Sequence, residues 1–393
     1  MLEKALTGSR KYKGLVALLV ILTGLGVYYY IQQWIYGLGI TGMSRDVSWG
    51  LYIANLTFFV GVAASSVMVV LPYYLHNYKE FGRITILGEF LAIAAVVIAV
   101  TSVVLDLGQP TRLLNLLLHP SLNSVLFWDV IVLSVYLLLN IVIAWSMLDA
   151  EHKSEPPLRW IKILIYISIP WAISIHTVTA FIYSGLAARP FWLTALLAPR
   201  FLASAFASGP ALLIILSLII RKFTKFDPGK VALQKLAQIA TYGLITTIFF
   251  LIVELFTSFY SNIPGHKMHF QYLLFGIEGY ANLVPWMWAS IILALGALVL
   301  LINPKTRKRE NILAVACFAI FVSIFIDKGL GLIVPGFIPS TTGKIFEYWP
   351  TLPEALITLG IWALGFLILT VLYKIAISVK EEISVNNLKG PGG

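Results

Sequence analysis

Long apolar stretches separated by short polar connections run through most of the chain. Windows of mostly apolar residues occur at about 14–35, 49–75, 84–105, 125–148, 160–185, 201–220, 236–260, 281–302, 312–327 and 354–377. A helix needs roughly 20 such residues to cross the hydrocarbon core of a bilayer. The pattern therefore predicts an all-α, polytopic membrane protein of about ten transmembrane helices. The ninth window is short, and it spans the bilayer only if the helix continues through Gly329–Pro335.

The composition agrees with a bilayer as the surrounding solvent. Only 12% of the 393 residues are charged, 59% are hydrophobic, and the mean hydropathy is +0.88. Soluble domains average about 25% charged residues. The chain contains no obvious linker between apolar windows, so we expect a single membrane domain over residues 1–393.

The basic residues predict how the helices are oriented. When the connections are numbered alternately from the N-terminus, 21 Lys and Arg residues fall on one side and 7 on the other. The seven are Arg45, Arg112, Arg189, Arg200, Lys267, Lys328 and Lys344. Loops rich in Lys and Arg stay in the cytoplasm. We therefore expect a multi-pass protein of the cytoplasmic membrane with both termini inside. The net charge of +10 is explained by these cytoplasmic basic residues and does not indicate a nucleic-acid partner.

Metal chemistry within the chain is poorly supported by its residues. The single cysteine, Cys317, cannot form an internal disulfide or hold an iron–sulfur cluster alone. A bis-histidine haem needs paired His residues at matching depth. Of the six histidines only His176 lies well inside a predicted span. We expect no metal site, no haem and no iron–sulfur cluster, so any such centre belongs to a partner.

Polar residues inside the predicted spans collect in their outer halves. Asn55, Asp129, His176 and Glu254 lie there, Asp106 and Asp327 close the outer ends of the third and ninth spans, and Glu89 lies near the inner end of the third. Ionisable groups within membrane helices are costly and mark functional sites by default.

Each of these residues also has a purely structural interpretation. Asn55 fits an interhelical hydrogen bond, and His176 fits a structural histidine. Glu254 is either a proton relay or a paired charge, whereas Asp327 with Lys328 is most simply a surface ion pair.

A quinone site would explain the outer cluster. Such a site needs an apolar slot, hydrogen-bond partners for the carbonyl oxygens and a titratable group that reaches water. Asn55, Asp129 and His176 supply these groups at overlapping depth, and Pro170 frees a backbone carbonyl near His176. The sequence therefore favours a quinone site near the outer surface.

Three outer segments are short, apolar and aromatic. They are residues 112–118, 190–197 and 270–275. This composition predicts helices that lie in the membrane interface, under a partner subunit.

Several motifs resemble a known family. They are WGLYIANLTFFVGVAAS at 49–65, DLGQPTR at 106–112, FWDV at 127–130 and SIHTVTAF at 174–181, followed by RPFW and SGPA. Together they resemble the NrfD/PsrC family of quinone-reactive membrane subunits. Within that family the whole chain is similar to the ten-helix branch found in DsrMKJOP-like complexes of sulfur metabolism and sulfate or sulfite respiration.

The resemblance implies a concrete plan. Family members form two four-helix bundles, here helices two to five at 49–185 and helices six to nine at 201–334, with the first and tenth helices outside. They bind menaquinone or menaquinol, carry no prosthetic group, and exchange electrons with a ferredoxin-like iron–sulfur protein on the extracytoplasmic face. The implied complex also contains cytochrome c, cytochrome b and a cytoplasmic iron–sulfur protein, so the chain would be a non-haem subunit rather than an enzyme alone.

The resemblance also assigns roles to residues. Asp129 falls on the acid of the family's WDV-type motif and would be catalytic, with Asn55 and His176 orienting the quinone and Trp49 and Trp128 walling the slot. Asp106 and Arg112 would lie beside the headgroup. Gln109 departs from the Arg of many relatives and leaves Arg112 as the nearer cation.

Other roles stay more general. Glu254, Asp327 and Glu89 are candidates for a proton path by analogy. A secondary transporter or proton-translocating protein is the alternative function, although the sequence shows no pair of broken helices in corresponding halves. A purely structural anchor is the third possibility.

Overall fold

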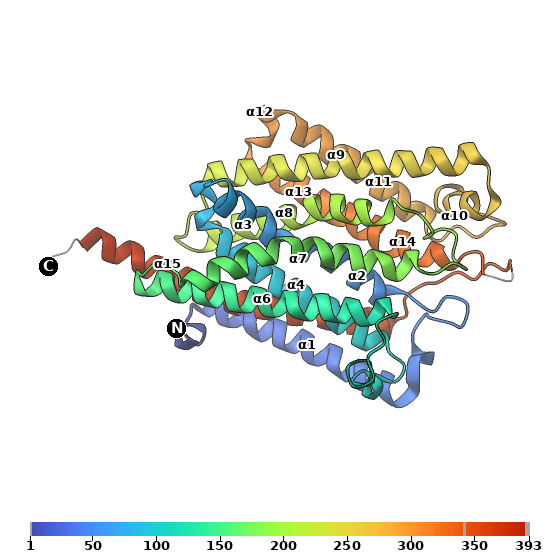
Figure 1. Ribbon diagram of the computed structural model, residues 1–393, viewed down its shortest axis with the longest axis horizontal. Helices are drawn as coiled ribbons and strands as arrows, with labels where there is room; N and C mark the ends of the chain where they lie inside the picture. The colour runs from blue at the N-terminus through green and yellow to red at the C-terminus, as the bar shows by residue number, and fades with distance from the viewer. Residues whose placement is uncertain (1, 341–342, 390–393) are drawn as a thin grey trace.

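The structure, a computed structural model, describes residues 2–340 and 343–389. Residues 1, 341–342 and 390–393 of the predicted single domain lie outside this description. In the described part, ten helical segments are long and apolar enough to cross a membrane, which confirms the predicted all-α, polytopic fold (Figure 1).

Most spans are single helices, and two are interrupted. The continuous ones are α1 (Arg10–Tyr36), α4 (Thr85–Asp106), α6 (Val125–Lys153), α7 (Arg159–Ser184), α8 (Leu197–Phe223), α9 (Lys230–Ser261), α11 (Val284–Ile302) and α15 (Leu352–Lys389). The second span consists of α2 (Leu51–Ala63) and α3 (Ser65–Leu75), which are separated at Ala64. The ninth consists of α13 (Glu310–Ile324), η5 (Phe325–Leu330), α14 (Gly331–Ile333) and η6 (Val334–Phe337).

The ninth span settles two expectations. It continues from Glu310 to Phe337, as its length required. The interpretation of Asp327 and Lys328 as a surface ion pair was wrong, because the helix continues past them and both side chains are buried. They lie in η5, a wide turn of π-helix.

Shorter elements connect the spans. They are η1 (Leu2–Ala5), η2 (Gly37–Ile40), η3 (Lys79–Arg83), η4 (Pro110–Arg112), α5 (Asn115–Leu118), α10 (Pro264–Phe275) and α12 (Pro304–Arg307). Residues 112–118 and 270–275 are thus largely helical, as expected. Residues 190–196 are not, because turns closed by backbone bonds such as Trp192 N–H to Arg189 O (3.1 Å) fold that segment.

The spans pack in two rings joined through α2. In the first ring, α2 with α3 contacts α4 and α7, and α6 contacts both α4 and α7. In the second ring, α8 contacts α9 and α13, and α11 contacts both α9 and α13. The α2 helix also packs against α8 and η5, so it is buried on every side and forms the centre of the molecule.

Two helices flank the rings. The first span, α1, packs along α15, and α15 packs against α4. The contact between α1 and α15 depends on glycine, since a Cβ atom at Gly26 would lie 2.6 Å from the Cα atom of Gly360. The other side of α1 is apolar and exposed, as a lipid-facing helix should be.

The two ends of the helix array differ. The end where α1 begins and α15 ends, on the left of Figure 1, is called the termini end, and the end that carries α5 and α10 is called the opposite end. At the termini end, Lys380 of α15 pairs with Glu151 of α6 (2.6 Å). With its 38 residues, α15 is roughly 57 Å long, and its last turns extend beyond the other helices in Figure 1.

Candidate functional site

One face of α7 carries three buried polar side chains. His176, Thr179 and Tyr183 are each at 0% exposure, and their spacing of three and four residues places them on the same side of the helix. Thr57 and Gly61 are one helical turn apart on α2, which contacts α7. A polar contact surface therefore forms between α2 and α7, inside the first ring.

Asp129 of α6 joins this surface. Its Oδ1 accepts a hydrogen bond of 2.6 Å from the Thr179 hydroxyl, and the residue is 1% exposed. The hydroxyl oxygens of Thr57 and Tyr183 lie 2.6 Å apart. Because the Thr57 hydroxyl donates to the carbonyl of Ile53 (2.8 Å), the Tyr183 hydroxyl must donate to Thr57.

His176 lies one helical turn further from the opposite end than Thr179. Its Nδ1 is 2.7 Å from the carbonyl oxygen of Ala172. A carbonyl oxygen only accepts hydrogen bonds, so Nδ1 carries the hydrogen and Nε2 of the neutral ring is an acceptor. This Nε2 atom is buried and has no hydrogen-bond partner among the described residues. The ring also lies beside the backbone of Gly61, and Nε2 is its one polar atom that forms no hydrogen bond of good geometry in the described chain.

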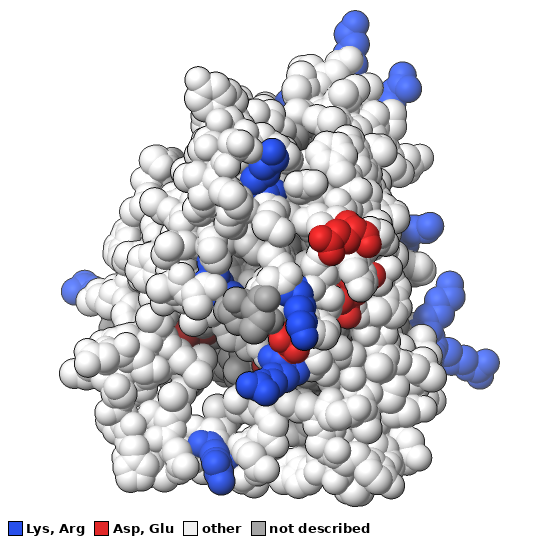
Figure 2. Space-filling view, turned by 90° about the vertical axis from the view of Figure 1, so that its right-hand side faces the viewer, with Lys and Arg blue, Asp and Glu red and all other residues white. Residues whose placement is uncertain are grey.

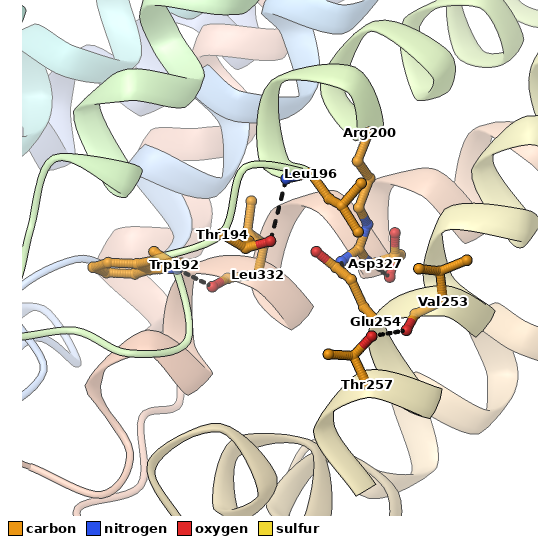
Figure 3. A network of polar contacts seen from close by, with 9 residues as sticks. All are labelled: Trp192, Thr194, Leu196, Arg200, Val253, Glu254, Thr257, Asp327 and Leu332. Carbon is orange, nitrogen blue, oxygen red and sulfur yellow. Dashed lines mark hydrogen bonds and ion pairs between the residues drawn. The ribbon is translucent and has the colours of Figure 1, made fainter. Parts of the chain in front are cut away.

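A triad of charges occupies the second ring. Arg200 of α8 forms ion pairs with Glu254 of α9 and with Asp327 of η5, the latter at 2.7 Å (Figure 3). All three residues are less than 9% exposed. Arg200 precedes the predicted span at 201–220 and is one of the seven basic residues expected on the outer side, but it lies within α8 and its guanidinium group points into the protein.

Lys328 follows Asp327 in sequence and points elsewhere. Its Nζ atom lies 3.4 Å from the carbonyl oxygen of Phe201 and 4.3 Å from the centre of the Phe201 ring. A Cβ atom at Gly61 would lie 3.1 Å from Nζ. Lys328 therefore connects the triad with the polar surface of α2 and α7.

These groups form one connected region, which we call the polar seam. Its members are Asp129, Thr179, Tyr183, Thr57, His176, Lys328, Asp327, Arg200 and Glu254. The seam crosses from the first ring to the second, in the half of the spans nearer the opposite end.

Aromatic rings cover the seam toward the opposite end. Trp49 contacts Tyr183, Trp192 and Phe337, with ring centres 5.6–5.8 Å apart. The indole N–H of Trp192 donates to the carbonyl of Leu332 (2.8 Å), which fixes that ring. Tyr183 belongs to both groups, so the aromatic cluster of Trp49, Tyr183, Trp192 and Phe337 lies directly on the seam.

A cavity of about 250 Å³ lies at the opposite end, beyond the aromatic cluster. Arg189 and His269 are among the residues that line it, and Arg189 also lies over the Phe337 ring at 4.5 Å. Burial lowers the pKa of Arg189, against an opposing effect of Asp46. Burial likewise lowers the pKa of His269, whose Nδ1 faces two backbone carbonyls. The face of the molecule at this end is mostly uncharged, with several Lys, Arg, Asp and Glu side chains scattered over it (Figure 2).

Other predicted site residues lie away from the seam. The Asn55 amide donates to the Leu51 carbonyl and accepts a hydrogen bond of 2.7 Å from the indole of Trp362 on α15. Trp128 is 43% exposed, and its indole donates to the carbonyl of Leu122. The structure therefore does not bring Asn55 or Trp128 together with Asp129 and His176.

The remaining candidates are also separate. Arg112 is exposed in η4. Asp106, at the end of α4, has a buried Oδ1 atom without a hydrogen-bond partner among the described residues. Glu89 is 2% exposed near the termini end, and neither of its carboxyl oxygens has a partner in the described chain. No three His, Cys, Asp or Glu side chains within residues 2–340 and 343–389 come together as a metal site would require.

Sequence reasoning missed Glu354. Its side chain accepts hydrogen bonds from the backbone N–H groups of Gly42 (2.9 Å) and Leu51 (3.3 Å) and from the hydroxyl of Tyr348. An acid in the first turn of a helix is usually interpreted as a favourable interaction with the positive end of that helix's own dipole. Here it instead binds the first amide of α2, a contact that sequence position does not reveal.

Comparison with known proteins gives a consistent picture. Residues 39–339 match the family model described as polysulphide reductase, NrfD. The chain is 27% identical to a Halobacterium salinarum protein named as a membrane subunit of dimethyl sulfoxide reductase, over 92% of this chain and 90% of that protein. It is 23% identical to a selenate reductase subunit of Mesobacillus selenatarsenatis (90% and 91%). It is 24% identical to the Hdr-like menaquinol oxidoreductase integral membrane subunit of Archaeoglobus fulgidus (95% of each chain).

Proposed function

Because the chain belongs to the NrfD family of polysulphide reductase membrane subunits, we propose that it binds menaquinone or menaquinol within a respiratory complex. Its relatives are membrane subunits of multi-subunit reductases, and one is named for menaquinol. The buried Asp129, held by Thr179 in the polar seam, is the observation that carries the proposal.

The residues of the seam fit a quinone headgroup. The Nε2 atom of His176 is a buried acceptor without a partner in the described chain, and a quinol hydroxyl would satisfy it. Asp129 lies one turn nearer the opposite end and carries an acid that accepts a hydrogen bond from Thr179. A bound quinone would supply redox chemistry that is coupled to proton exchange.

The chain's own residues then have distinct tasks. Asp129 holds or releases the exchanged proton at its carboxyl group, and Thr179 keeps that carboxyl in place. His176 orients the headgroup through Nε2. The aromatic cluster excludes water from this side of the seam, while Asn55 ties α2 to α15 through Trp362.

The proposed orientation places the opposite end outside the cytoplasm. Arg200 and Lys328 are buried in the seam, which leaves Arg45, Arg112, Arg189, Lys267 and Lys344 as the basic residues near that surface. The imbalance in favour of the termini end is therefore greater than the sequence count suggested. An extracytoplasmic iron–sulfur protein would exchange electrons at the opposite end, as in a DsrMKJOP-like complex with DsrP as its membrane subunit.

The test replaces the acid in the assembled complex. We expect Asp129→Asn to lower quinol-dependent reduction of the partner's iron–sulfur centres by about 100-fold, the effect of removing a general acid–base group. Asp149→Asn is the matched control, because Asp149 lies on the same helix at the termini end and pairs only with Lys153 in the described chain. Normal turnover of a fully assembled Asp129→Asn complex would remove Asp129 from the mechanism.

The two interrupted spans favour one alternative, a secondary transporter. The second span breaks at Ala64 and the ninth contains the π turn of η5, and transporter sites are often built from such segments. A transporter would be stable when purified alone and would bind its solute without partners. A quinone-reactive protein should instead co-purify with redox proteins and carry extractable quinone, which a purely structural anchor would lack.

A further inference from the structure

The cavity at the opposite end has walls from three separate segments of the chain. They are the turn between α7 and α8, the helix α10, and the end of the ninth span. Its volume of about 250 Å³ is below the roughly 300–1,000 Å³ of pockets that enclose a drug-sized molecule. It is large compared with one water molecule, whose share of the liquid is about 30 Å³. The cavity therefore fits a group of the size of a protein side chain better than a quinone with its tail.

Arg189 carries the one formal charge among the described residues that line the cavity. His269 is the other lining residue that could be charged, and its Nδ1 lies 2.7 Å from the carbonyl oxygen of Pro335 and 2.6 Å from that of Ile338. Burial lowers the pKa of His269, so its ring is neutral near pH 7. Because no acid lines the cavity in the described chain, its single charge favours an anionic occupant.

The charge of Arg189 is weakly compensated within the described chain. Its guanidinium donates a long hydrogen bond of 3.5 Å to the carbonyl oxygen of Gly336 and lies over the Phe337 ring at 4.5 Å. No carboxylate of the described residues forms an ion pair with it within 4 Å. Most of its N–H donors are therefore left for another acceptor, and a carboxylate matches their planar arrangement.

Two further cations lie next to the cavity. Lys267 immediately precedes the lining residue Met268 in α10. The exposed Lys344 ends a turn in which its carbonyl accepts a hydrogen bond of 2.8 Å from the N–H of Ser340, another lining residue. Cations around a pocket attract an acidic partner and suppress the approach of a basic one.

The cavity adjoins the aromatic cluster that covers the seam. Gly336 lines the cavity, and a Cβ atom at this position would approach the ring of Trp192 within 2.1 Å. Arg189 lies over Phe337, another ring of the cluster, and the cluster includes Tyr183 of the seam. A group that fills the cavity therefore lies next to the rings that separate the seam from the opposite end.

We propose that this cavity is the docking pocket of the extracytoplasmic redox partner, and that an acidic side chain of that partner enters it and pairs with Arg189. A partner anchored there holds its redox centre on the side of the seam that the aromatic cluster covers. This rests on the proposed function, which places an iron–sulfur protein at the opposite end. Arg189 is then the residue that recognises the partner, and a carboxylate is the group that it recognises.

Two neighbouring alanines test whether the partner enters the cavity. Ala188 lines the cavity and Ala187 does not, although both are exposed. We expect Ala188→Phe to lower the affinity for the iron–sulfur partner at least about tenfold, because it fills the space of the entering side chain. Ala187→Phe should leave the affinity unchanged. The measurement is the amount of partner that stays bound to the purified complex on dilution, and equal affinities in the two variants would overturn the proposal.

A second pair of variants tests the charge. Arg189→Gln keeps a polar side chain and removes the cation, and we expect it to weaken partner binding at least about tenfold. Arg45→Gln is the control, because Arg45 is an exposed cation near the same surface that does not line the cavity. A similar loss in both variants would show a general attraction between the two surfaces and would overturn the docking pocket.

A cross-link identifies the occupant. In the assembled Arg189→Lys complex, a carbodiimide forms an amide bond between the introduced amine and a carboxylate in contact with it. We expect mass spectrometry to find this amine joined to an Asp or Glu of the iron–sulfur partner. A bond to Asp46 of this chain, an adduct with a free organic acid, or no bond in an assembled complex would overturn the proposal.

The abundance of each variant in the membrane and its midpoint of thermal unfolding show whether it is folded. Should the Arg189 variants not fold, the two alanine variants decide the proposal, since both alter exposed positions.

These outcomes also distinguish the docking pocket from the proposed function. If Asp129→Asn abolishes turnover while Ala188→Phe and Arg189→Gln bind the partner as wild type does, the docking pocket is refuted and the quinone site stands. If the complex carries no quinone and Asp129→Asn is fully active, the quinone site fails. The partner affinities and the cross-link then still decide the docking pocket, because neither measurement requires quinol.

Discussion

Charged side chains inside the spans are stabilised in two different ways. Arg200 is held by two carboxylates, so its charge is compensated by direct ion pairs. Lys328 depends on the excess negative charge of that same triad, without touching a carboxylate of the described residues within 4 Å. The first arrangement compensates a charge through direct contacts, whereas the second compensates it only through the surrounding charges.

Removing Arg200 should be severely destabilising. Arg200→Met leaves Glu254 and Asp327 buried without their cation, and breaking such a buried pair costs about 3–5 kcal/mol. The expected result is a lower midpoint of thermal unfolding in detergent and poorer assembly.

Arg221→Met is the control for this prediction. Arg221 lies at the other end of the same helix and pairs with Glu310, and both side chains are partly exposed. An exposed pair contributes at most about 1 kcal/mol. Equal unfolding midpoints for the two variants would contradict a central role of the triad.

Individual helices position these residues through irregularities of the backbone. The π turn of η5 contains an extra residue relative to an α-helix, which rotates the side chains that follow it. The side chains of Asp327 and Lys328 can therefore point toward different rings of helices, although the two residues are neighbours in sequence. The interruption at Ala64 similarly divides the second span into two helices.

Close helix packing at the edge of the molecule depends on one glycine pair. We expect Gly26→Val to push α1 away from α15 and to lower stability by about 1–3 kcal/mol, the usual cost of overpacking. Gly24→Val is a closely matched control, because no described atom lies within 4 Å of a Cβ at that position on the same helix. Thermal unfolding of the purified protein should show the difference, and indistinguishable midpoints would refute the close contact.

For the whole molecule, the sequence could predict how many spans exist and how deep their polar residues lie. Apolar run length and the alternation of basic residues contain that information. The rotation of each helix about its axis could not be predicted, because spans that are apolar on every side lack an amphipathic face. Asn55 and Thr57 illustrate this, since they are two residues apart but face α15 and α7 respectively.

The sequence therefore predicted the depth of the polar residues in the membrane better than it predicted which of them lie together. Asp129 and His176 were expected at overlapping depth, and both join the polar seam, whereas Asn55 does not. The sequence did not predict that Arg200 and Lys328 are buried, because each lies near a predicted helix end, where a cation is normally solvated. Only the continuation of the ninth span to Phe337 and the start of α8 at Leu197 reveal that both are enclosed.

The orientation of the whole protein is open to a direct test. The native Cys317 is fully buried, so single introduced cysteines can be labelled against a low background. We expect a membrane-impermeant maleimide to label Lys344→Cys in intact cells. Lys308→Cys, at the termini end, should react only after the membrane is permeabilised, and its labelling in intact cells would reverse the proposed topology.

The length of α15 gives the protein a rigid arm on the side of its termini. A bilayer with its headgroups is about 40–45 Å thick, so only the last turns of this helix of roughly 57 Å stand beyond the lipid headgroups. A fluorescent or affinity domain fused after this helix would be held clear of the bilayer. Because the arm is continuous with the span that contacts Asn55, its tilt would report movements of the membrane-embedded helices.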